Sequence, residues 1–215
     1  MTGPAREDAP RQPDGGAATG YTLVLPPGWQ HIPVRQGSEE AIRKIARSAA
    51  PDVTGGVPRD KMVSYRVELE HKLRTAVRDA RRKCATDLYL PLGLVRGMPV
   101  PASFLVSELS LGSVEEIDPA LVVSHLATAD GDARPVTVAG ALGVRTERTA
   151  SADPQAQVEY PSRRVDYVIA VPGDAGRYLA VAFSTLGGGK PDDAYSSLLV
   201  ELFDAIMSTW RWRSE

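Results

Sequence analysis

Residues 162–212, SRRVDYVIAVPGDAGRYLAVAFSTLGGGKPDDAYSSLLVELFDAIMSTWRW, decide the fold of this chain. Apolar residues occupy every second position on both sides of the PGDAG sequence at 172–176, which is typical of β-strands with one buried face. Because the connection is short and glycine-rich, we expect the two strands to be antiparallel neighbours. The alternating positions are Val165, Tyr167, Ile169 and Val171 before the turn, and Leu179, Val181 and Phe183 after it.

The same stretch closes with a helix that begins near Pro191, after the glycine run at 187–189. Proline fits the first position of a helix, and Asp192 and Asp193 carry the negative charge that a helix N-terminus favours. We therefore expect an antiparallel sheet closed by a C-terminal helix. The helix positions expected to be buried are Tyr195, Leu198, Leu199, Leu202, Ile206 and Trp210.

Further strands and helices are predicted upstream of this unit. Helices are expected from Ser38 to just before Pro51, at 59–83 and at 118–126. Because most strand patterns follow one another directly, the fold class is α+β, with an antiparallel sheet of about six strands flanked by helices. The remaining predicted strands lie at 21–25, 86–91, 102–111, 134–139 and 142–149.

Length and composition fit one domain behind a disordered tail. The chain has 215 residues, of which 43% are hydrophobic, enough for a sizeable core. Residues 1–20 are rich in Pro, Gly and Ala without apolar periodicity, so we predict a tail there and a single α+β domain at 21–215. A net charge of −2 argues against wholesale binding to nucleic acid or to an anionic membrane.

Cysteine use and hydropathy indicate the compartment. Cys84 is the single cysteine, so the chain forms no internal disulfide. The first twenty residues lack the apolar core of a signal peptide, and no stretch of 18 or more apolar residues occurs. We therefore expect a cytoplasmic protein without membrane insertion.

A resemblance to a known family rests on three features. These are the sequence LPPGW at 25–29 after a strand, a mid-chain meander with polar loops, and the closing strand, glycine turn and helix that ends in Trp. Together they resemble the MOG1/PsbP-like fold family, including its bacterial LpqN-like branch, over residues 21–212. The chain departs from the family in its long helix at 59–83 and in lacking the signal peptide of exported relatives. The resemblance implies a mostly non-catalytic binding or assembly role for larger partners, with no catalytic residues to transfer.

The glycine run followed by Lys190 invites comparison with a phosphate-binding loop. That motif, G-x-x-x-x-G-K-[ST], needs Ser or Thr after the lysine, where this chain has Pro191. Ser184 stands where the first glycine belongs. We expect a tight turn, with a weak anion site at the helix N-terminus as the alternative. The chain also lacks a G-x-S-x-G nucleophile elbow.

Other candidate chemistry has a structural explanation. Cys84 continues the apolar stripe of the long helix, so a buried thiol is expected, although the cations at 81–83 suit a reactive thiol. Glu68 and His71 lie one helical turn apart without further ligands, so we expect no metal, and no motif indicates a cofactor. The acidic pairs at 115–116 and 192–193 fit helix starts.

The end of the long helix is basic, and its cations are the candidate partner-binding residues. A solvated face explains them too, and nucleic acid is disfavoured because aromatics are lacking and Asp79 interrupts the run. These residues are Arg74, Arg78, Arg81, Arg82 and Lys83.

We expect a non-catalytic binding or assembly module that acts through protein–protein contacts. Its site is expected at a sheet edge or in the cleft between the long helix and the C-terminal hairpin. The alternative is a small hydrolase or transferase with a site in the loops at 93–99 and 151–161. An enzyme should show a pocket of converging titratable groups, and a binding module an apolar or charged patch.

Overall fold

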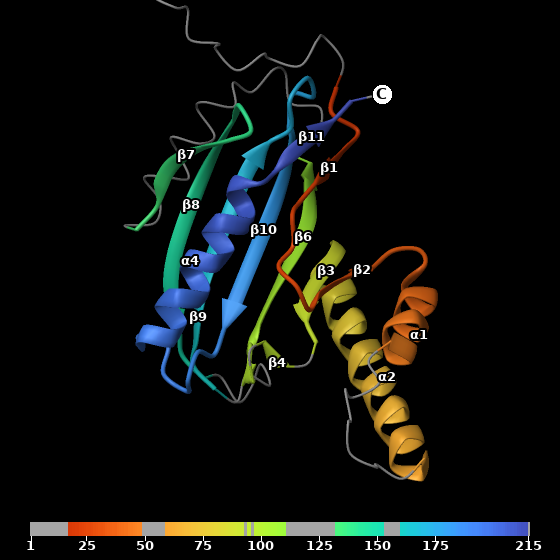
Figure 1. Cartoon of the computed structure of the whole chain (residues 1–215). Helices are drawn as coiled ribbons and strands as arrows, with labels where there is room; N and C mark the ends of the chain where they lie inside the picture. Colours follow the sequence, from red (N-terminus) through yellow and green to blue (C-terminus); the bar gives the residue numbers. More distant parts are fainter. Residues whose placement is uncertain are drawn as a thin grey trace, which may run out of the picture.

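The computed structural model describes residues 17–48, 59–92, 94–95, 97–110, 132–152 and 160–214. A seven-stranded antiparallel sheet forms its centre, in the order β2-β3-β6-β10-β9-β8-β7 (Figure 1). The α+β fold class is confirmed, with one more strand than the sequence indicated. The strands of this sheet are β2 (Trp29–Pro33), β3 (Ala85–Pro91), β6 (Ala102–Ser110), β7 (Arg134–Val138), β8 (Ala141–Ala150), β9 (Ser162–Ala170) and β10 (Arg177–Thr185).

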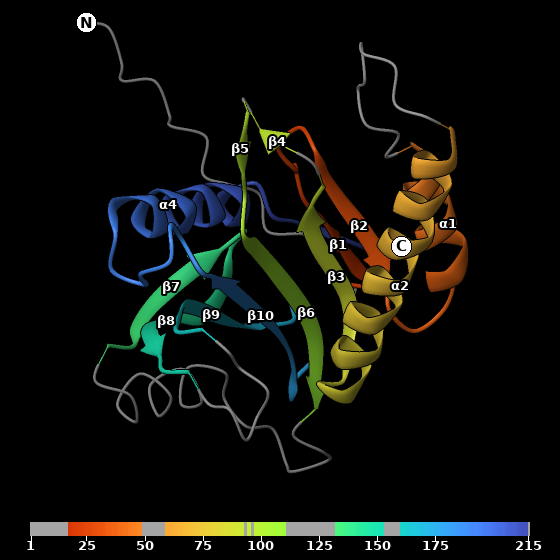
Figure 2. The ribbon, with the colours of Figure 1, turned by 90° about the horizontal axis from the view of Figure 1, so that it is seen from below.

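Helices lie on both faces of this sheet. Helix α4 (Ala194–Ser208) covers one face, here called the inner face, whereas α1 (Ser38–Ser48) and α2 (Arg59–Arg82) pack beside β2 and β3 on the outer face (Figure 2). Two short pairs complete the fold: β1 (Gly20–Thr22) with β11 (Arg211–Arg213), and β4 (Leu94–Val95) with β5 (Met98–Pro99). In the described part of the chain no helix is long and apolar enough to cross a bilayer.

The C-terminal hairpin forms as its pattern predicts. Tyr167 of β9 lies opposite Val181 of β10, and Val165 lies opposite Phe183, so the alternating residues share the inner face. The phenyl ring of Phe183 stacks on that of Phe203 in α4, with ring centroids 4.6 Å apart. Burial of apolar residues on alternate positions therefore fixes the register of this hairpin.

The buried face of α4 differs from the prediction at one expected position. Leu198 is 55% exposed, whereas Ser196, Val200, Phe203 and Met207 are buried. Apolar residues occur on several sides of this helix, so their spacing alone does not determine which side faces the sheet. The observed buried side of α4 includes Ser196, which contacts the preceding glycine turn.

A second apolar cluster lies on the outer face. Leu88 of β3 packs there with Leu73 and Val77 of α2, while its neighbour Tyr89 faces the inner core. Strands β3 and β6 are thus covered on both faces at the α2 end of the sheet. The apolar stripe predicted along α2 is mostly buried between residues 69 and 80. Tyr65, an apolar position nearer the start of the helix, is 44% exposed.

Order begins earlier along the chain than predicted. Ala18 is buried, and its N–H donates to the Pro172 carbonyl at 2.9 Å. Gly20 pairs with Arg213 in the β1–β11 ribbon. The assignment of residues 18–20 to a disordered tail is therefore wrong, because they bond residues more than 150 positions away along the chain, near Pro172 and Arg213, which no local pattern reveals.

The prediction that Cys84 is buried is also wrong. Helix α2 ends at Arg82, and Cys84 adopts a φ of 57° in the turn into β3, where it is exposed. A left-handed residue commonly ends a helix, and it breaks the helical spacing that the prediction extended. The predicted helix at 118–126, the acidic pair at 115–116 and His125 lie outside the described residues.

Candidate functional site

Three places on the described surface gather polar or apolar side chains into a candidate site. The first is the α4 seam, formed by Arg145, Glu147, Arg163, Asp204, Tyr167 and Ser197 between α4 and strands β8 and β9. The second is the strap pocket, which lies under the β1–β11 ribbon. The third is the α2 groove, between α2 and the outer face of β3, β6 and β10.

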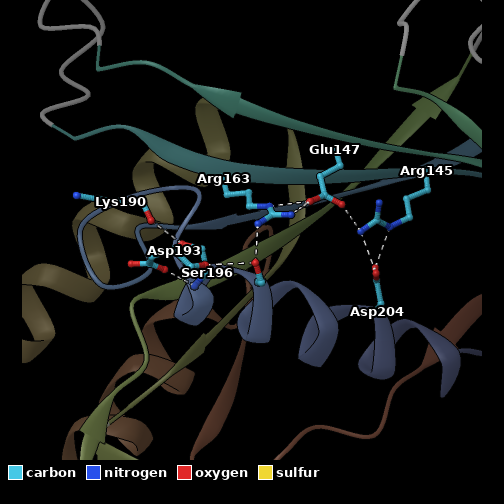
Figure 3. Close-up of polar contacts among 8 residues, drawn as sticks. Arg145, Glu147, Arg163, Lys190, Asp193, Ser196 and Asp204 are labelled. Atoms are coloured by element: carbon cyan, nitrogen blue, oxygen red, sulfur yellow. Dashed lines mark hydrogen bonds and ion pairs between the residues drawn. The ribbon is translucent and has the colours of Figure 1, made fainter.

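The backbone N–H groups of the glycine turn before α4 donate to acceptors within the turn and the start of the helix. Asp193 caps the helix: its Oδ1 accepts the Ser196 N–H at 2.6 Å (Figure 3). Its Oδ2 accepts the Gly188 N–H at 2.7 Å. These hydrogen bonds, that from Ser196 foremost, lower the pKa of Asp193. The N–H of Gly189 donates to the Leu186 carbonyl. The tight turn is confirmed. The carboxylate of Asp193 already accepts the backbone N–H groups of Ser196 and Gly188, which a bound phosphate would need as donors.

The α4 seam joins two strands to α4 through compensated charges. Arg145 is only 4% exposed and donates to both carboxylate oxygens of Asp204, at 3.0 and 2.9 Å. Glu147 bridges Arg145 and Arg163, and Arg163 also donates to Ser197 at 3.0 Å (Figure 3). Each guanidinium therefore faces a carboxylate.

The electrostatics of the seam favour a structural role. Burial raises the pKa of Glu147, but the hydrogen bonds from Arg145 and Arg163 outweigh that effect and lower it. Tyr167 donates to Asp204 at 2.8 Å, and burial is the main cause that raises the pKa of this phenol. A buried ion network of this kind costs several kcal/mol to break at one partner. The seam therefore holds α4 in position.

The strap pocket has a volume of about 480 Å³ and brings titratable groups together from strands far apart in sequence. His31 of β2 places Nε2 2.6 Å from Asp87 Oδ1 in β3. Tyr21 of β1 donates to Asp87 Oδ2 at 3.0 Å, and its hydroxyl lies 3.0 Å from that of Tyr89. A chain of hydrogen bonds thus runs from the two phenols to one carboxylate.

A β-bulge positions Asp87 in this pocket. The register of β3 against β6 shifts between Ala85 and Asp87, so Ala85 packs with α2 on the outer face while Asp87 faces inward beside Tyr89. An inserted residue in one strand changes which side chains face each side of a sheet. Without the bulge, residues two apart point to the same face.

Burial governs protonation in the strap pocket. It raises the pKa of Tyr89 to about 12 and raises that of Tyr21 further, so both phenols stay protonated and donate. Burial also raises the pKa of Asp87, but hydrogen bonds from His31, Thr86 and Tyr21 outweigh it and lower the pKa. A His–Asp pair can orient an imidazole for proton transfer. Among the described residues no serine or cysteine lines the pocket with it.

The α2 groove has a volume of about 390 Å³, and none of the described residues that line it is titratable. Small side chains of Ser103 and Ser184 lie beneath it on the outer face of β6 and β10. This is the cleft between the long helix and the C-terminal hairpin that the sequence suggested as a site. The apolar lining comes chiefly from Ala76, Leu88, Leu90, Val100 and Leu186.

Two of the five candidate basic residues hold the helices together. Arg74 bonds Glu39 of α1 at 3.1 Å and Glu70 at 2.8 Å. Arg81 donates to the Val34 carbonyl at 2.9 Å and to the hydroxyl of Ser38, which opens α1, at 2.8 Å.

The other three basic residues are exposed. Arg82 forms a surface ion pair with Asp79 at 3.3 Å. The side chains of Arg78 and Lys83 have no hydrogen-bond or ion-pair partner among the described residues. The five cations therefore do not act as one free patch.

The remaining candidate groups do not converge. Glu68 pairs with Lys72 at 2.7 Å, and His71 is exposed beside it. Within the described ranges no cluster of three or more His, Cys, Asp or Glu side chains could hold a metal. Of the loops proposed for a hydrolase, residues 94–95 and 98–99 form the short β4–β5 pair.

Sequence reasoning missed the strap pocket. His31 and Asp87 lie 56 residues apart, and Tyr21 and Asp87 lie 66 apart, so no motif connects them. For the seam a signal existed: Arg145 and Glu147 stand two apart on one strand and so share a face.

No model of a known protein family matches this chain, and no curated protein sequence matches it. The resemblance to the MOG1/PsbP-like fold family therefore stays a prediction.

Proposed function

We propose that this chain is a non-catalytic binding module that acts through protein–protein contacts, with the α2 groove as its partner site. The observation that carries the proposal is the chemistry of the groove. The described part of its lining is mostly apolar and holds no titratable side chain. Such a surface favours burial of a partner's apolar side chains over proton transfer or nucleophilic attack.

The groove suits a short segment of a partner. Ala182 is exposed in the middle of β10, the central strand, and Ser184 lies next to the groove on the same face. Small side chains at these positions let another chain approach the sheet closely. Leu186, which lines the groove, is 38% exposed and adds accessible apolar surface there.

The size of the groove limits the affinity that it supplies. Burying one apolar side chain contributes about 1.5–3 kcal/mol, so two anchors contribute about 3–6 kcal/mol. A micromolar complex needs roughly 8 kcal/mol. Apolar anchoring therefore supports a weak, transient complex unless polar contacts beside the groove add to it.

Peptide selection tests this proposal. Short random peptides displayed on phage are selected on the immobilised full chain, and the selected peptides are titrated by fluorescence anisotropy. Ser184→Phe places an aromatic ring in the groove, and we expect it to abolish binding. Leu142→Phe, at a position that is 46% exposed on β8 and outside the groove, is the matched control and should bind as the wild type does. Equal binding by both variants, or no selected peptide, contradicts the proposal.

A second candidate is a small hydrolase or transferase, and the His31–Asp87 pair favours it. The site of such an enzyme would be the strap pocket, where this pair lies, and not the loops at 93–99 and 151–161. It predicts that a small polar ligand raises the melting temperature and that His31→Gln removes this effect. A thermal-shift screen of small metabolites checks it, and an empty screen counts against it.

The proposal includes a cytoplasmic location, which the single cysteine supports. It requires neither a cofactor nor a metal.

A further inference from the structure

We infer that the partner segment bound in the α2 groove carries an acidic residue one to three positions from its apolar anchor, and that Arg164 and Arg148 select it. This inference rests on the proposed function of the groove. It specifies the chemistry of the partner: an extended protein segment with an apolar side chain followed closely by Asp or Glu.

The register of the sheet leads from the groove to these two arginines. Ser184 of β10 lies opposite Arg164 of β9, and Arg164 lies opposite Arg148 of β8. Neighbouring strands are about 4.8 Å apart, so the two arginines begin about 5 and 10 Å from the groove. An extended segment rises about 3.3 Å per residue, which sets the spacing of one to three residues.

Both arginines point away from α4. Their neighbours in sequence, Val165 and Glu147, face the inner core and the α4 seam, so alternation directs Arg164 and Arg148 to the outer face. The ion pair between Arg148 and Asp166 lies on that face. Arg164 and Arg148, here called the arginine strip, therefore lie on the same outer face of the sheet as the groove and next to it.

The arginine strip carries more positive charge than the described residues around it compensate. Among the described residues, Arg164 bonds only the hydroxyl of Ser162, at 3.4 Å. Arg148 is 55% exposed and lies 3.4 Å from Asp166. Two guanidinium groups thus share one carboxylate, whereas Arg145 and Arg163 on the inner face are each paired. An added carboxylate can form charge-assisted hydrogen bonds with these groups.

The direct pairing of two arginines has a stability cost. Like charges directly opposite each other on neighbouring strands are unfavourable. A partner carboxylate near Arg164 and Arg148 relieves that repulsion, so binding and stability favour different residues at this site. This trade-off is common where a surface serves a partner.

Charge reversal at one position tests the inference. Random-peptide selections are run in parallel on the wild-type chain and on Arg164→Glu. We expect the wild type to enrich an apolar residue followed within three positions by Asp or Glu, and Arg164→Glu to keep the anchor but enrich Lys or Arg instead. An acidic wild-type peptide should bind Arg164→Glu about fivefold more weakly or worse. Arg78→Glu, on the exposed end of α2, should leave the acidic preference unchanged.

A stability measurement accompanies the selection. Arg164→Glu replaces an Arg–Arg pair by a Glu–Arg pair, so its melting temperature should rise by up to about 4 °C. Arg164→Gln is the second variant, and it should lose the acidic preference without reversing it.

Each outcome is decisive. Peptides that need the groove but show no acidic preference overturn the inference and leave the proposed function standing. An acidic preference that survives Arg164→Glu and disappears in Arg78→Glu also overturns it. Selected peptides that bind Ser184→Phe normally refute the proposed function itself. A sharp fall in the melting temperature of Arg164→Glu shows that the fold requires this arginine, which overturns the inference too.

Discussion

Gly187 offers the sharpest test of how the turn before α4 is built. Its φ is 55°, and a Cβ added there would overlap the hydroxyl of Ser196. A non-glycine residue in the left-handed region costs about 1–2 kcal/mol. Displacing Ser196 breaks the hydrogen bond from its hydroxyl to the Lys190 carbonyl, 2.9 Å long, which is worth about 0.5–1.5 kcal/mol.

Gly187→Ala should therefore lower the free energy of unfolding by about 2–3 kcal/mol, or the melting temperature by about 4–12 °C. Urea unfolding followed by tryptophan fluorescence measures it, since Trp210 is fully buried. Gly189→Ala is the control: its φ is 110° but no atom lies within 4 Å of an added Cβ, so it carries only the backbone strain.

A double-mutant cycle separates the overlap with the Ser196 hydroxyl from the other costs, which are the backbone strain and the close approach to Asp193 Oδ1. In a Ser196→Ala background the hydroxyl is gone, so Gly187→Ala should cost about 1 kcal/mol less than in the wild type. If the cost is the same in both backgrounds, the overlap with the Ser196 hydroxyl is not the reason for glycine at this position. If Gly187→Ala costs no more than Gly189→Ala, close packing of the turn adds nothing to the backbone strain.

Four further predictions follow from burial, exposure and protonation. A chain that starts at residue 21 should melt several degrees below one that starts at residue 17, because it lacks buried Ala18 and part of β1; equal melting temperatures would contradict this. Cys84 should react rapidly with a thiol reagent in the native protein, since it is exposed, and a reaction that requires denaturant would contradict its placement. The folded pKa of Asp87 lies below its ordinary value, so its stabilisation is present above about pH 4 and is lost as the pH falls further. Asp87→Asn should accordingly destabilise the chain more at about pH 7 than at about pH 3, in urea titrations at both values, and an equal loss would refute the assignment. The pKa of Tyr89 is raised to about 12, so its stabilisation should fade between about pH 10 and 12, and Tyr89→Phe should flatten that alkaline limb of the unfolding curve.

Regular elements with strong local patterns were predictable. The alternation in β9 and β10 placed both strands, and the three- and four-residue spacing located α2 within one residue of its observed end at Arg82. Strand β2 was missed: no strand was predicted at 29–33, although Trp29, its first residue, is buried in the core. A five-residue strand that contains His31 and Pro33 presents too little apolar alternation to be recognised.

The candidate sites, too, were predictable only as far as local sequence patterns determine them. The α2 groove was foreseen in outline, because a long amphipathic helix must pack on the sheet that follows it. Its value as a site depends on Ser103, Ser184 and Arg164, which share one row only through strand pairing. The basic end of α2 was overrated as a site, because its sequence shows the charges of Arg74 and Arg81 but not their partners on α1 and just after β2.

By itself the sequence determined the α+β class, the C-terminal hairpin and the closing helix, because alternation and helical spacing act between residues close along the chain. It also determined that the glycine run cannot be a standard phosphate loop. Only the tertiary structure decided the strand order, the bulge that turns Asp87 inward and the pairing of Arg164 with Arg148. The physical reason is that such contacts join residues many positions apart, whose proximity is set by how sheet and helices bury their apolar faces together.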